Sequence, residues 1–228
     1  MLVRGFDAVL VPVWEPAQRS LWRARRLWFV TRVKAKARVG WAQIDVDVAP
    51  DVRLGRRINV DIQPWTRNSL VIGAQTVVGD DVVLHFMGGR IAIGRRTIVR
   101  KGVWADSAGE LHIGNGAFIG YGSFLHCAVS TTVEDLATLA EHVTVTDSAH
   151  VRTPEDVPAF WHVEASATSV GRNSWLGAHA VVTAGVRVGQ CAFVGANATV
   201  TEDVPDGWLA AGNPAKVIRR LEVVEPGA

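Results

Sequence analysis

The hydrophobic positions of residues 170–205 recur every six residues. The segment divides into the hexads VGRNSW, LGAHAV, VTAGVR, VGQCAF, VGANAT and VTEDVP. The first residue of each hexad is aliphatic: Val170, Leu176, Val182, Val188, Val194 and Val200. The fifth is small or β-branched: Ser174, Ala180, Val186, Ala192, Ala198 and Val204. A period of six fits neither an amphipathic helix nor a hairpin meander. It predicts a solenoid of short strands, one per hexad and three per coil.

Glycine follows the aliphatic residue in four of the hexads, at Gly171, Gly177, Gly189 and Gly195. We expect the first residue to point inward and fill the axis of the coil, and the fifth to pack close to the inside. We expect the glycine to lie at a corner with a positive φ, a conformation that costs little only without a Cβ.

The same phase extends back along the chain to about Val48. Extra residues accumulate in the third hexad of a coil, and the largest excess, nineteen residues, lies between Val145 and Val170. Insertions in a solenoid tend to fall on one side of it. We therefore expect residues 151–169 to form a structureless loop at one corner of a triangular prism, and a loop of this length suggests function.

The residues before the repeats differ in character. Residues 1–15 are apolar but interrupted by Pro12, and we expect an extended arm. From Ala17 to about Lys36 the residues favour a helix, which Pro16 suits as a start. An open solenoid end exposes backbone groups and needs a cap. We therefore expect an arm and basic helical cap over 1–45, a β-helix over 46–205 and a short tail over 206–228.

Charge is distributed unevenly along the chain. Residues 17–38 contain eight basic residues and no acidic one, which leaves 16 basic and 22 acidic residues elsewhere. This basic, Trp-bearing segment is expected to pack against the solenoid, with contact to an anionic membrane surface as the alternative. The acidic remainder disfavours nucleic-acid binding. No signal peptide or membrane-spanning apolar run is visible. Cys127 and Cys191 are too few for a disulfide framework, which favours a reducing cytoplasm.

His150 is the leading candidate for chemistry. It ends the run VTVTDSAH, directly before the large insertion, where a neutral imidazole is suited to act as a general base. The alternative is a surface histidine at a corner. Asp147 is a candidate to orient His150, or else a turn residue. His162, beside Trp161 in the insertion, is the second candidate base, and His126, one coil earlier, is a candidate to line an acceptor pocket.

A zinc site has little support in the sequence. Solenoids of this kind can hold zinc with three histidines, of which two are commonly spaced His-x4-His on one chain, but no two histidines here have that spacing. The nearest pair, His142 and His150, is eight apart. A catalytic zinc ion needs three protein ligands, so we predict no metal site.

Three features together resemble one family. The hexads of 170–205, the strand ending at His150 and the tail AAGNPAKVIRR are similar to the hexapeptide-repeat acyltransferases with a left-handed parallel β-helix. Within them, the sequence resembles the branch of galactoside, maltose, nodulation-factor and xenobiotic acetyltransferases, including O-acetyltransferases of bacterial polysaccharide clusters. The close match covers roughly residues 113–221. The resemblance implies an all-β, left-handed fold, acetyl-CoA as acyl donor, and a homotrimer with active sites between subunits.

The resemblance also implies residue roles. His150 would take the proton from an acceptor hydroxyl as it attacks the thioester, and a backbone N–H near Ala178 would stabilise the oxyanion. Trp175 would lie beside the acceptor. Ala178 and Ala196 would line the pantetheine arm, and Thr201, Lys216 and Arg219 would lie near the adenine and phosphates. Two departures stand out. Relatives commonly have a basic residue where this chain has Glu202, and the Asn and Asp residues that hold sugar in galactoside-type relatives are not evident around Gly120–Ala128.

These observations predict a cytoplasmic, trimeric O-acetyltransferase that uses acetyl-CoA and modifies a sugar hydroxyl in surface polysaccharide or glycoconjugate biosynthesis. The basic segment suggests a lipid-linked glycan acceptor and peripheral contact with the inner face of the membrane. Three alternatives stay open: acetylation of an antibiotic, another xenobiotic or an amine; a γ-type carbonic anhydrase on the same scaffold; and a non-catalytic scaffold.

Overall fold

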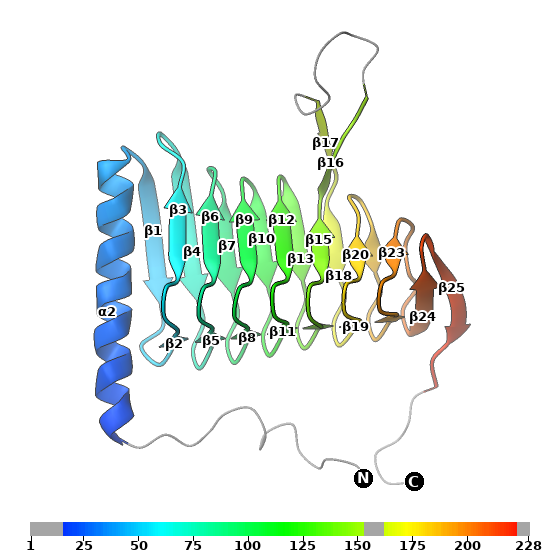
Figure 1. Ribbon diagram of the computed structural model, residues 1–228, viewed down its shortest axis with the longest axis horizontal. Coiled ribbons are helices and arrows are strands. Elements are labelled where there is room, and N and C mark those ends of the chain that lie inside the picture. The colour runs from blue at the N-terminus through cyan, green and yellow to red at the C-terminus, as the bar shows by residue number, and fades with distance from the viewer. Residues whose placement is uncertain (1–15, 153–161, 223–228) are drawn as a thin grey trace.

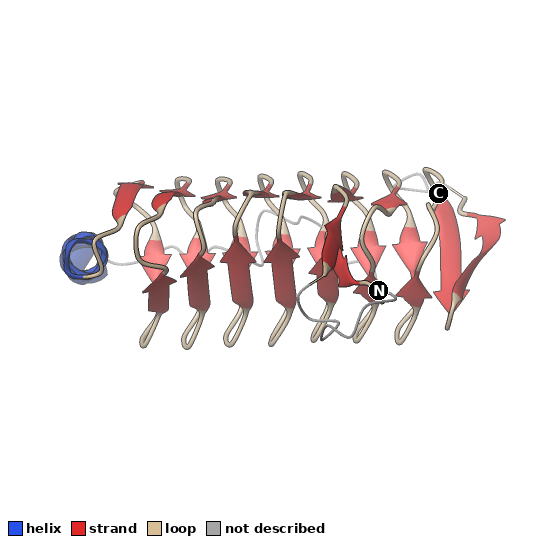
Figure 2. Ribbon diagram, turned by 90° about the horizontal axis from the view of Figure 1, so that it is seen from above, coloured by secondary structure: helices blue, strands red, loops and turns tan. Residues whose placement is uncertain are grey.

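The chain forms a solenoid of parallel strands with a helix across one end. The computed structural model describes residues 16–152 and 162–222. In these residues the chain winds through seven left-handed coils, each with one strand in each of three sheets. Figure 1 shows the coils stacked along one axis, and Figure 2 shows helix α2 (Pro16–Val39) end-on beside the first coil. The predicted all-β, left-handed parallel β-helix is confirmed.

The three sheets are named A, B and C here in the order in which each coil visits them. Sheet A contains β1 (Gln43–Val48), β4 (Arg67–Ile72), β7 (Arg90–Ile93), β10 (Glu110–Ile113), β13 (Ser130–Val133), β18 (Thr168–Val170) and β21 (Arg187–Val188). Sheet B contains β2 (Arg53–Leu54), β5 (Val77–Val78), β8 (Ile98–Val99), β11 (Phe118–Ile119), β14 (Thr138–Leu139), β19 (Trp175–Leu176), β22 (Phe193–Val194), β24 (Trp208–Gly212) and β25 (Ala215–Arg220). Sheet C contains β3 (Asn59–Ile62), β6 (Val83–Phe86), β9 (Trp104–Ser107), β12 (Phe124–Cys127), β15 (Thr144–Thr146), β20 (Val181–Val182) and β23 (Thr199–Val200).

The core is a column of inward side chains along the axis. Strands of neighbouring coils pair in register, so that Leu111 lies beside Ile91 and Thr131. The first and fifth positions of the hexads are buried as predicted, with Val194 and Ala198 both 0% exposed. Each buried aliphatic side chain contributes about 1.5–3 kcal/mol. Because each coil contacts only its neighbours, stability accumulates along the axis.

The predicted conformation of the repeat glycines is wrong. The positive φ angles fall on the fourth residue of a hexad, as in Asn173 at 53° and His179 at 60°. The glycine in the second position is instead required by the close approach of the next coil. A Cβ on Gly177 would lie 2.5 Å from the backbone nitrogen of Ala196. The spacing between coils, and not the turn, selects glycine there.

The extra residues lie where they were predicted, on the side where sheet C passes to sheet A. In coils two to four the strands of sheet C have four residues, whereas the strands of sheet B have two. The prediction of a structureless loop over 151–169 is wrong for its second half. Residues Val163–Ala165 form strand β17, which pairs antiparallel with β16 (Ser148–His150), and Thr168 already belongs to sheet A. The hairpin β16–β17 projects from the solenoid (Figure 1).

Helix α2 closes the first coil. It extends slightly beyond the predicted range, and the first strand begins at Gln43, five residues earlier than the repeats suggest. The Arg26 side chain donates a hydrogen bond of 2.6 Å to the carbonyl of Val48, and Arg32 donates to the carbonyl of Ile58. The buried apolar residues of the helix are Phe29, Val33 and Ala37.

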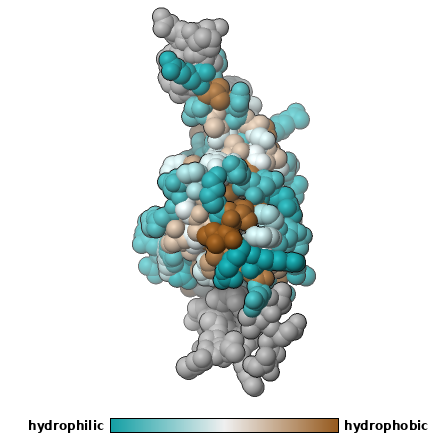
Figure 3. Space-filling view, turned by 90° about the vertical axis from the view of Figure 1, so that its right-hand side faces the viewer, coloured by the Kyte–Doolittle hydropathy of each residue, from teal (hydrophilic) through white to brown (hydrophobic). Residues whose placement is uncertain are grey.

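The other end of the solenoid is closed by the antiparallel pair β24–β25. The turn between these strands contains Asn213 and Pro214, as the sequence predicts. Figure 3 views this end and shows an apolar patch in the middle of a polar surface. Val217 and Ile218 of β25 have exposed side chains at this end.

Candidate active site

The leading candidate base lies on the hairpin that leaves the fifth coil. His150 pairs with Val163 across β16–β17, and the amide of Val151 donates to the carbonyl of His162 at 3.0 Å. The His150 side chain is exposed. The second candidate base, His162, has a buried Nε2 without a hydrogen-bond partner among the described residues. Trp161, a predicted acceptor-binding residue, lies outside the described residues.

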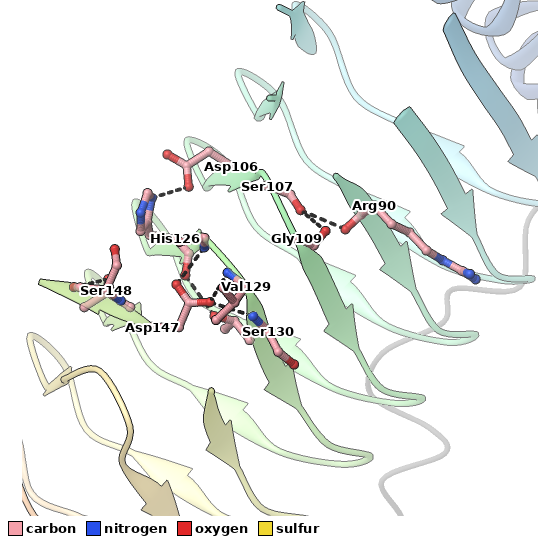
Figure 4. A network of polar contacts seen from close by, with 12 residues as sticks. Arg90, Asp106, Ser107, Gly109, His126, Val129, Ser130, Asp147 and Ser148 are labelled. Carbon is pink, nitrogen blue, oxygen red and sulfur yellow. Dashed lines mark hydrogen bonds and ion pairs between the residues drawn. The ribbon is translucent and has the colours of Figure 1, made fainter. Parts of the chain in front are cut away.

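Asp147 anchors the base of this hairpin. Its side chain is fully buried, and its carboxylate accepts three backbone hydrogen bonds, of 2.7, 2.8 and 2.7 Å, from the amides of Ala128, Val129 and Ser130. The carbonyl of Asp147 accepts from the amide of Ser166 at 2.7 Å. Figure 4 shows the carboxylate aimed at the turn of the preceding coil. No hydrogen bond joins Asp147 to the His150 ring in the described part of the chain, so the structure does not bring these two side chains together as a dyad.

A histidine–carboxylate pair lies on the neighbouring coils. The Nδ1 of His126 lies 2.6 Å from Oδ1 of Asp106, its register partner one coil earlier (Figure 4). This hydrogen bond raises the pKa of His126, while partial burial opposes the rise. The ring of Phe124 stacks on the His126 ring, with centroids 6.1 Å apart. The pair is therefore an oriented imidazole with an enhanced tendency to carry positive charge.

Asp106 is the member of this site that the sequence analysis missed. It lies twenty residues before His126, which is one full coil in this part of the repeat. The length of a coil could have identified Asp106 as the partner of His126, because residues one coil apart in equivalent positions become register partners. On the other side of His126 the register partner is Thr146 of β15, directly before Asp147.

The predicted donor-site residues lie at a different corner. Ala178 follows β19 of sheet B and precedes β20 of sheet C, and Ala196 occupies the same corner one coil later. The amide of Asn197 donates to the Ala178 carbonyl at 2.9 Å. The Ala178 N–H itself has no backbone acceptor among the described residues. In comparable turns this N–H is capped by a side chain of a neighbouring coil, as at Arg95, whose amide donates to Asn115 at 3.0 Å.

The remaining predicted donor-site residues lie near the last coils. Lys216 forms an ion pair with Glu202 at 3.6 Å, and both side chains are exposed. The acidic residue that departs from the family pattern therefore offsets this cation, and an exposed pair of this kind is weak. Thr201 and Arg219 are also exposed.

Trp175 presents an aromatic surface on the outside of sheet B. Its ring stacks on Phe193 of the next coil, with centroids 5.8 Å apart and planes 10° from parallel. The two side chains are 43% and 39% exposed.

Six of the residues described above fall into two groups. Asp106, His126, Asp147 and His150 gather where sheet C passes to sheet A. Ala178 and Ala196 lie on the opposite edge of sheet C, where the chain arrives from sheet B. No group of three His, Cys, Asp or Glu side chains within the described ranges is placed to hold a metal ion. Over the same residues, no helix combines the length and apolarity needed to cross a membrane.

Comparison with known proteins gives the family of the repeats. Residues 167–202 match the family model described as bacterial transferase hexapeptide (six repeats). The chain is 35% identical over 126 residues to Nodulation protein L of Rhizobium leguminosarum bv. viciae, covering 55% of this chain and 66% of that protein. It is 26% identical over 129 residues to Galactoside O-acetyltransferase of Escherichia coli (strain K12), covering 57% and 63%. The chain thus spans slightly less than two thirds of the length of each of these relatives.

One of the similar solved structures is a mutant of AntD, an N-acyltransferase from Bacillus cereus, in complex with dTDP-4-amino-4,6-dideoxyglucose and Coenzyme A. It aligns with a TM-score of 0.49 at 18% identity, covering 78% of this chain and 83% of that chain. Residues 167–202 thus match the hexapeptide-repeat family model, and the chain is similar to the galactoside and nodulation-type proteins.

Proposed function

We propose that this protein is an acetyltransferase that transfers the acetyl group of acetyl-CoA to a sugar hydroxyl in surface polysaccharide or glycoconjugate biosynthesis. The similarity to Galactoside O-acetyltransferase supports the reaction class. The observation that carries the proposal is the position of His150, exposed on a hairpin whose base is fixed by the buried Asp147 carboxylate. An imidazole held in this way is suited to meet a substrate hydroxyl.

In the proposed reaction, His150 removes the proton from the acceptor hydroxyl as its oxygen attacks the thioester carbon. The tetrahedral oxyanion accepts a hydrogen bond from the Ala178 N–H, which has no acceptor among the described residues. The C–S bond then breaks, and the coenzyme A thiolate takes the proton from the His150 imidazolium. Ala196 is small enough to let the pantetheine arm pass, and Thr201, Lys216 and Arg219 lie toward the nucleotide end.

In this proposal, aromatic and charged groups near the two edges of sheet C bind the acceptor. Trp175 offers a partly exposed ring. In this proposal His126, which is oriented by Asp106, hydrogen-bonds a sugar oxygen or pairs with an acidic sugar. We propose that Trp161 also contributes to acceptor binding.

The proposal requires more than one copy of the chain. His150 and Ala178 lie on opposite edges of sheet C, so we propose that the two residues meet one thioester from two different subunits. A homotrimer in which the His150 hairpin of one subunit faces the Ala178 corner of the next would complete the site. Analytical ultracentrifugation tests this arrangement: a trimer is expected, and a monomer with full transferase activity would contradict it.

The proposal places the reaction in the cytoplasm, at the inner face of the membrane, with α2 in peripheral contact with lipid. The two free cysteines fit a reducing compartment. Liposome flotation of the full chain and of a chain lacking residues 1–40 tests the contact. Equal flotation of the two proteins would contradict the proposed contact with lipid.

The decisive experiment compares wild type with His150→Ala. Calorimetry with acetyl-CoA measures donor binding, and acetyl transfer to a panel of sugars measures catalysis. We expect both proteins to bind the donor and transfer to fall by about 100-fold or more in the variant, since general-base catalysis contributes about 10²–10⁴-fold. His112→Ala, at an exposed position of sheet A, is the matched control and should retain activity. Absence of acetyl-CoA binding by wild type would overturn the proposal.

A further inference from the structure

A cleft lies between helix α2 and the first coil, at the end of the molecule away from the C-terminal strands. Its volume is about 300 Å³. Aromatic and aliphatic side chains form part of its wall, and no carboxylate lines it. Its charged lining residues are Arg25, Arg32, Arg56 and Arg57. A concave site with four guanidinium groups favours an anion.

Two of these arginines are already engaged by the fold. Arg57 makes two hydrogen bonds to Asp81, of 2.5 and 2.7 Å. Arg32 donates to the carbonyl of Ile58, and its guanidinium lies 4.6 Å from the centroid of the Trp28 ring. These contacts fix the cleft without a ligand.

The other two arginines carry charge that the described residues do not neutralise. Arg25 lies 5.3 Å from the ring centroid of Trp22, a contact that leaves its donors available. No ion pair joins Arg25 or Arg56 to a carboxylate in the described part of the chain. The backbone amide of Arg56 donates to Asp80 at 2.7 Å. This bond fixes the backbone of Arg56 and does not involve its guanidinium. Guanidinium groups bind phosphate oxygens through paired N–H donors.

Helix α2 presents exposed apolar side chains in and near the cleft. Trp28 lines the cleft and is 62% exposed, and its neighbour Leu27 is 65% exposed. Leu21, one heptad before Trp28 on the same helix, is 52% exposed. A ligand that satisfies both the arginines and these exposed apolar side chains of α2 has a phosphate group attached to an apolar chain.

We propose that the cleft between α2 and the first coil is a binding site for a lipid-borne phosphate, with Arg25 and Arg56 as its principal ligands and Trp28 in contact with the apolar chain. The phosphate belongs either to an anionic lipid headgroup or to the phosphate or diphosphate of a lipid-linked glycan. This inference deepens the proposed function and rests on it only for the role of the lipid in presenting an acceptor.

The chain provides a matched control for the arginines. The turn Gly94–Arg95–Arg96 repeats the sequence of Gly55–Arg56–Arg57 two coils later but lies at another corner, outside the cleft. Arg96 and Arg57 share a positive φ, of 56° and 53°. The test pair is therefore Arg25→Gln with Arg56→Gln, against Arg95→Gln with Arg96→Gln. Arg56→Gln alone changes one exposed side chain and serves if the double variant folds poorly.

Three ligands are offered to each protein: inorganic pyrophosphate, vesicles of phosphatidylcholine, and vesicles of phosphatidylcholine with phosphatidylglycerol. Wild type and control are expected to bind pyrophosphate and the anionic vesicles, and the cleft variant is expected to bind both at least tenfold more weakly. Competition by pyrophosphate for the vesicles would assign the lipid phosphate to the cleft. Pyrophosphate binding lost in the cleft variant, with no vesicle binding by wild type, would overturn the lipid-borne source and leave a site for a soluble phosphate.

Two results would overturn the site. One is equal binding by wild type and the cleft variant, and the other is an equal loss in the cleft variant and the control, which would indicate general surface charge. Transfer to soluble sugars separates this inference from the proposed function. The cleft variant should retain that transfer, whereas failure of the transferase proposal would abolish it in wild type as well.

Discussion

At the scale of single residues, the fully buried Asp147 makes the contacts that hold the candidate site to the solenoid. Its carboxylate accepts three amide hydrogen bonds from residues 128–130. A buried charge is stable only when such donors surround it. The same residue begins the hairpin that carries His150, so its hydrogen bonds to one coil fix the exit of the chain from the next.

Asp147→Ala should therefore lower the free energy of unfolding by about 3 kcal/mol, because it leaves three partly buried amides without their acceptor. Urea denaturation measures the change. Asp203→Ala is the control: this exposed carboxylate accepts one amide bond, from Arg187 at 2.7 Å, and should cost about 1 kcal/mol or less. Equal losses in the two variants would contradict the anchoring role.

The pair Asp106–His126 predicts a pH dependence. The hydrogen bond raises the pKa of His126 above its ordinary value of 6.5, so the folded state binds the proton more tightly than the unfolded state. The stabilisation is fully present below pH 6.5 and is lost as the pH rises through the pKa of the folded state. Asp106→Asn should lower the pKa of His126 in an NMR titration. An unchanged His126 titration would refute the pairing.

At the scale of elements, much of the fold follows from the sequence because the repeat is local. The period of six specified which residues of β18–β23 point inward, and Pro16 marked the start of α2. Two features did not follow. Close approach between coils, which decides the place of glycine, depends on backbone atoms of the next coil, far along the chain. The pairing of β16 with β17 depends on contacts across the insertion, where no repeat constrains the chain.

The candidate site was predictable only in part for the same reason. His150 was identified from its place at the end of a strand, and Asp106 escaped notice because its partner comes from another coil. The carboxylate of Asp147 was expected near His150 because the two residues are three apart in the sequence. Its actual partners, the amides of residues 128–130, are set by the stacking of coils.

The glycine requirement can be measured directly. A Cβ on Gly120 would lie 2.4 Å from the carbonyl carbon of Ala140, so Gly120→Ala should destabilise the protein by about 3 kcal/mol as the coils separate. Gly40→Ala is the control, because its Cβ would meet atoms only at 3.5 and 3.7 Å. That substitution should change stability by less than about 1 kcal/mol. Thermal unfolding measures the stability of both variants. Similar losses of stability in the two would contradict the explanation.

At the scale of the whole molecule, the stacking of coils makes stability regional. Contacts run from each coil to the next, and the two ends are closed by different devices, α2 and β24–β25. Damage to one coil is therefore expected to spread only to its neighbours.

Val194→Asp places a carboxylate in the core of the last coils, where Val194 is 0% exposed. Hydrogen exchange should show lost protection in β19–β23 while β1–β6 stay protected, since a buried unpaired charge is costly. Val78→Asp, at a similarly buried position near the other end, should give the reverse pattern. Uniform loss of protection in either variant would show that the solenoid unfolds as one unit.

The fixed rise per coil gives the molecule a built-in ruler. The arginine cleft lies beside the first coil, and the hairpin of His150 leaves the fifth. Four steps of about 4.8 Å, the spacing of paired strands, separate them by roughly 19 Å along the axis. A chain with one coil more or less would lengthen or shorten that interval by one step. If the cleft holds the lipid end of a glycan, the number of coils between the cleft and the hairpin determines which sugar of that glycan reaches His150.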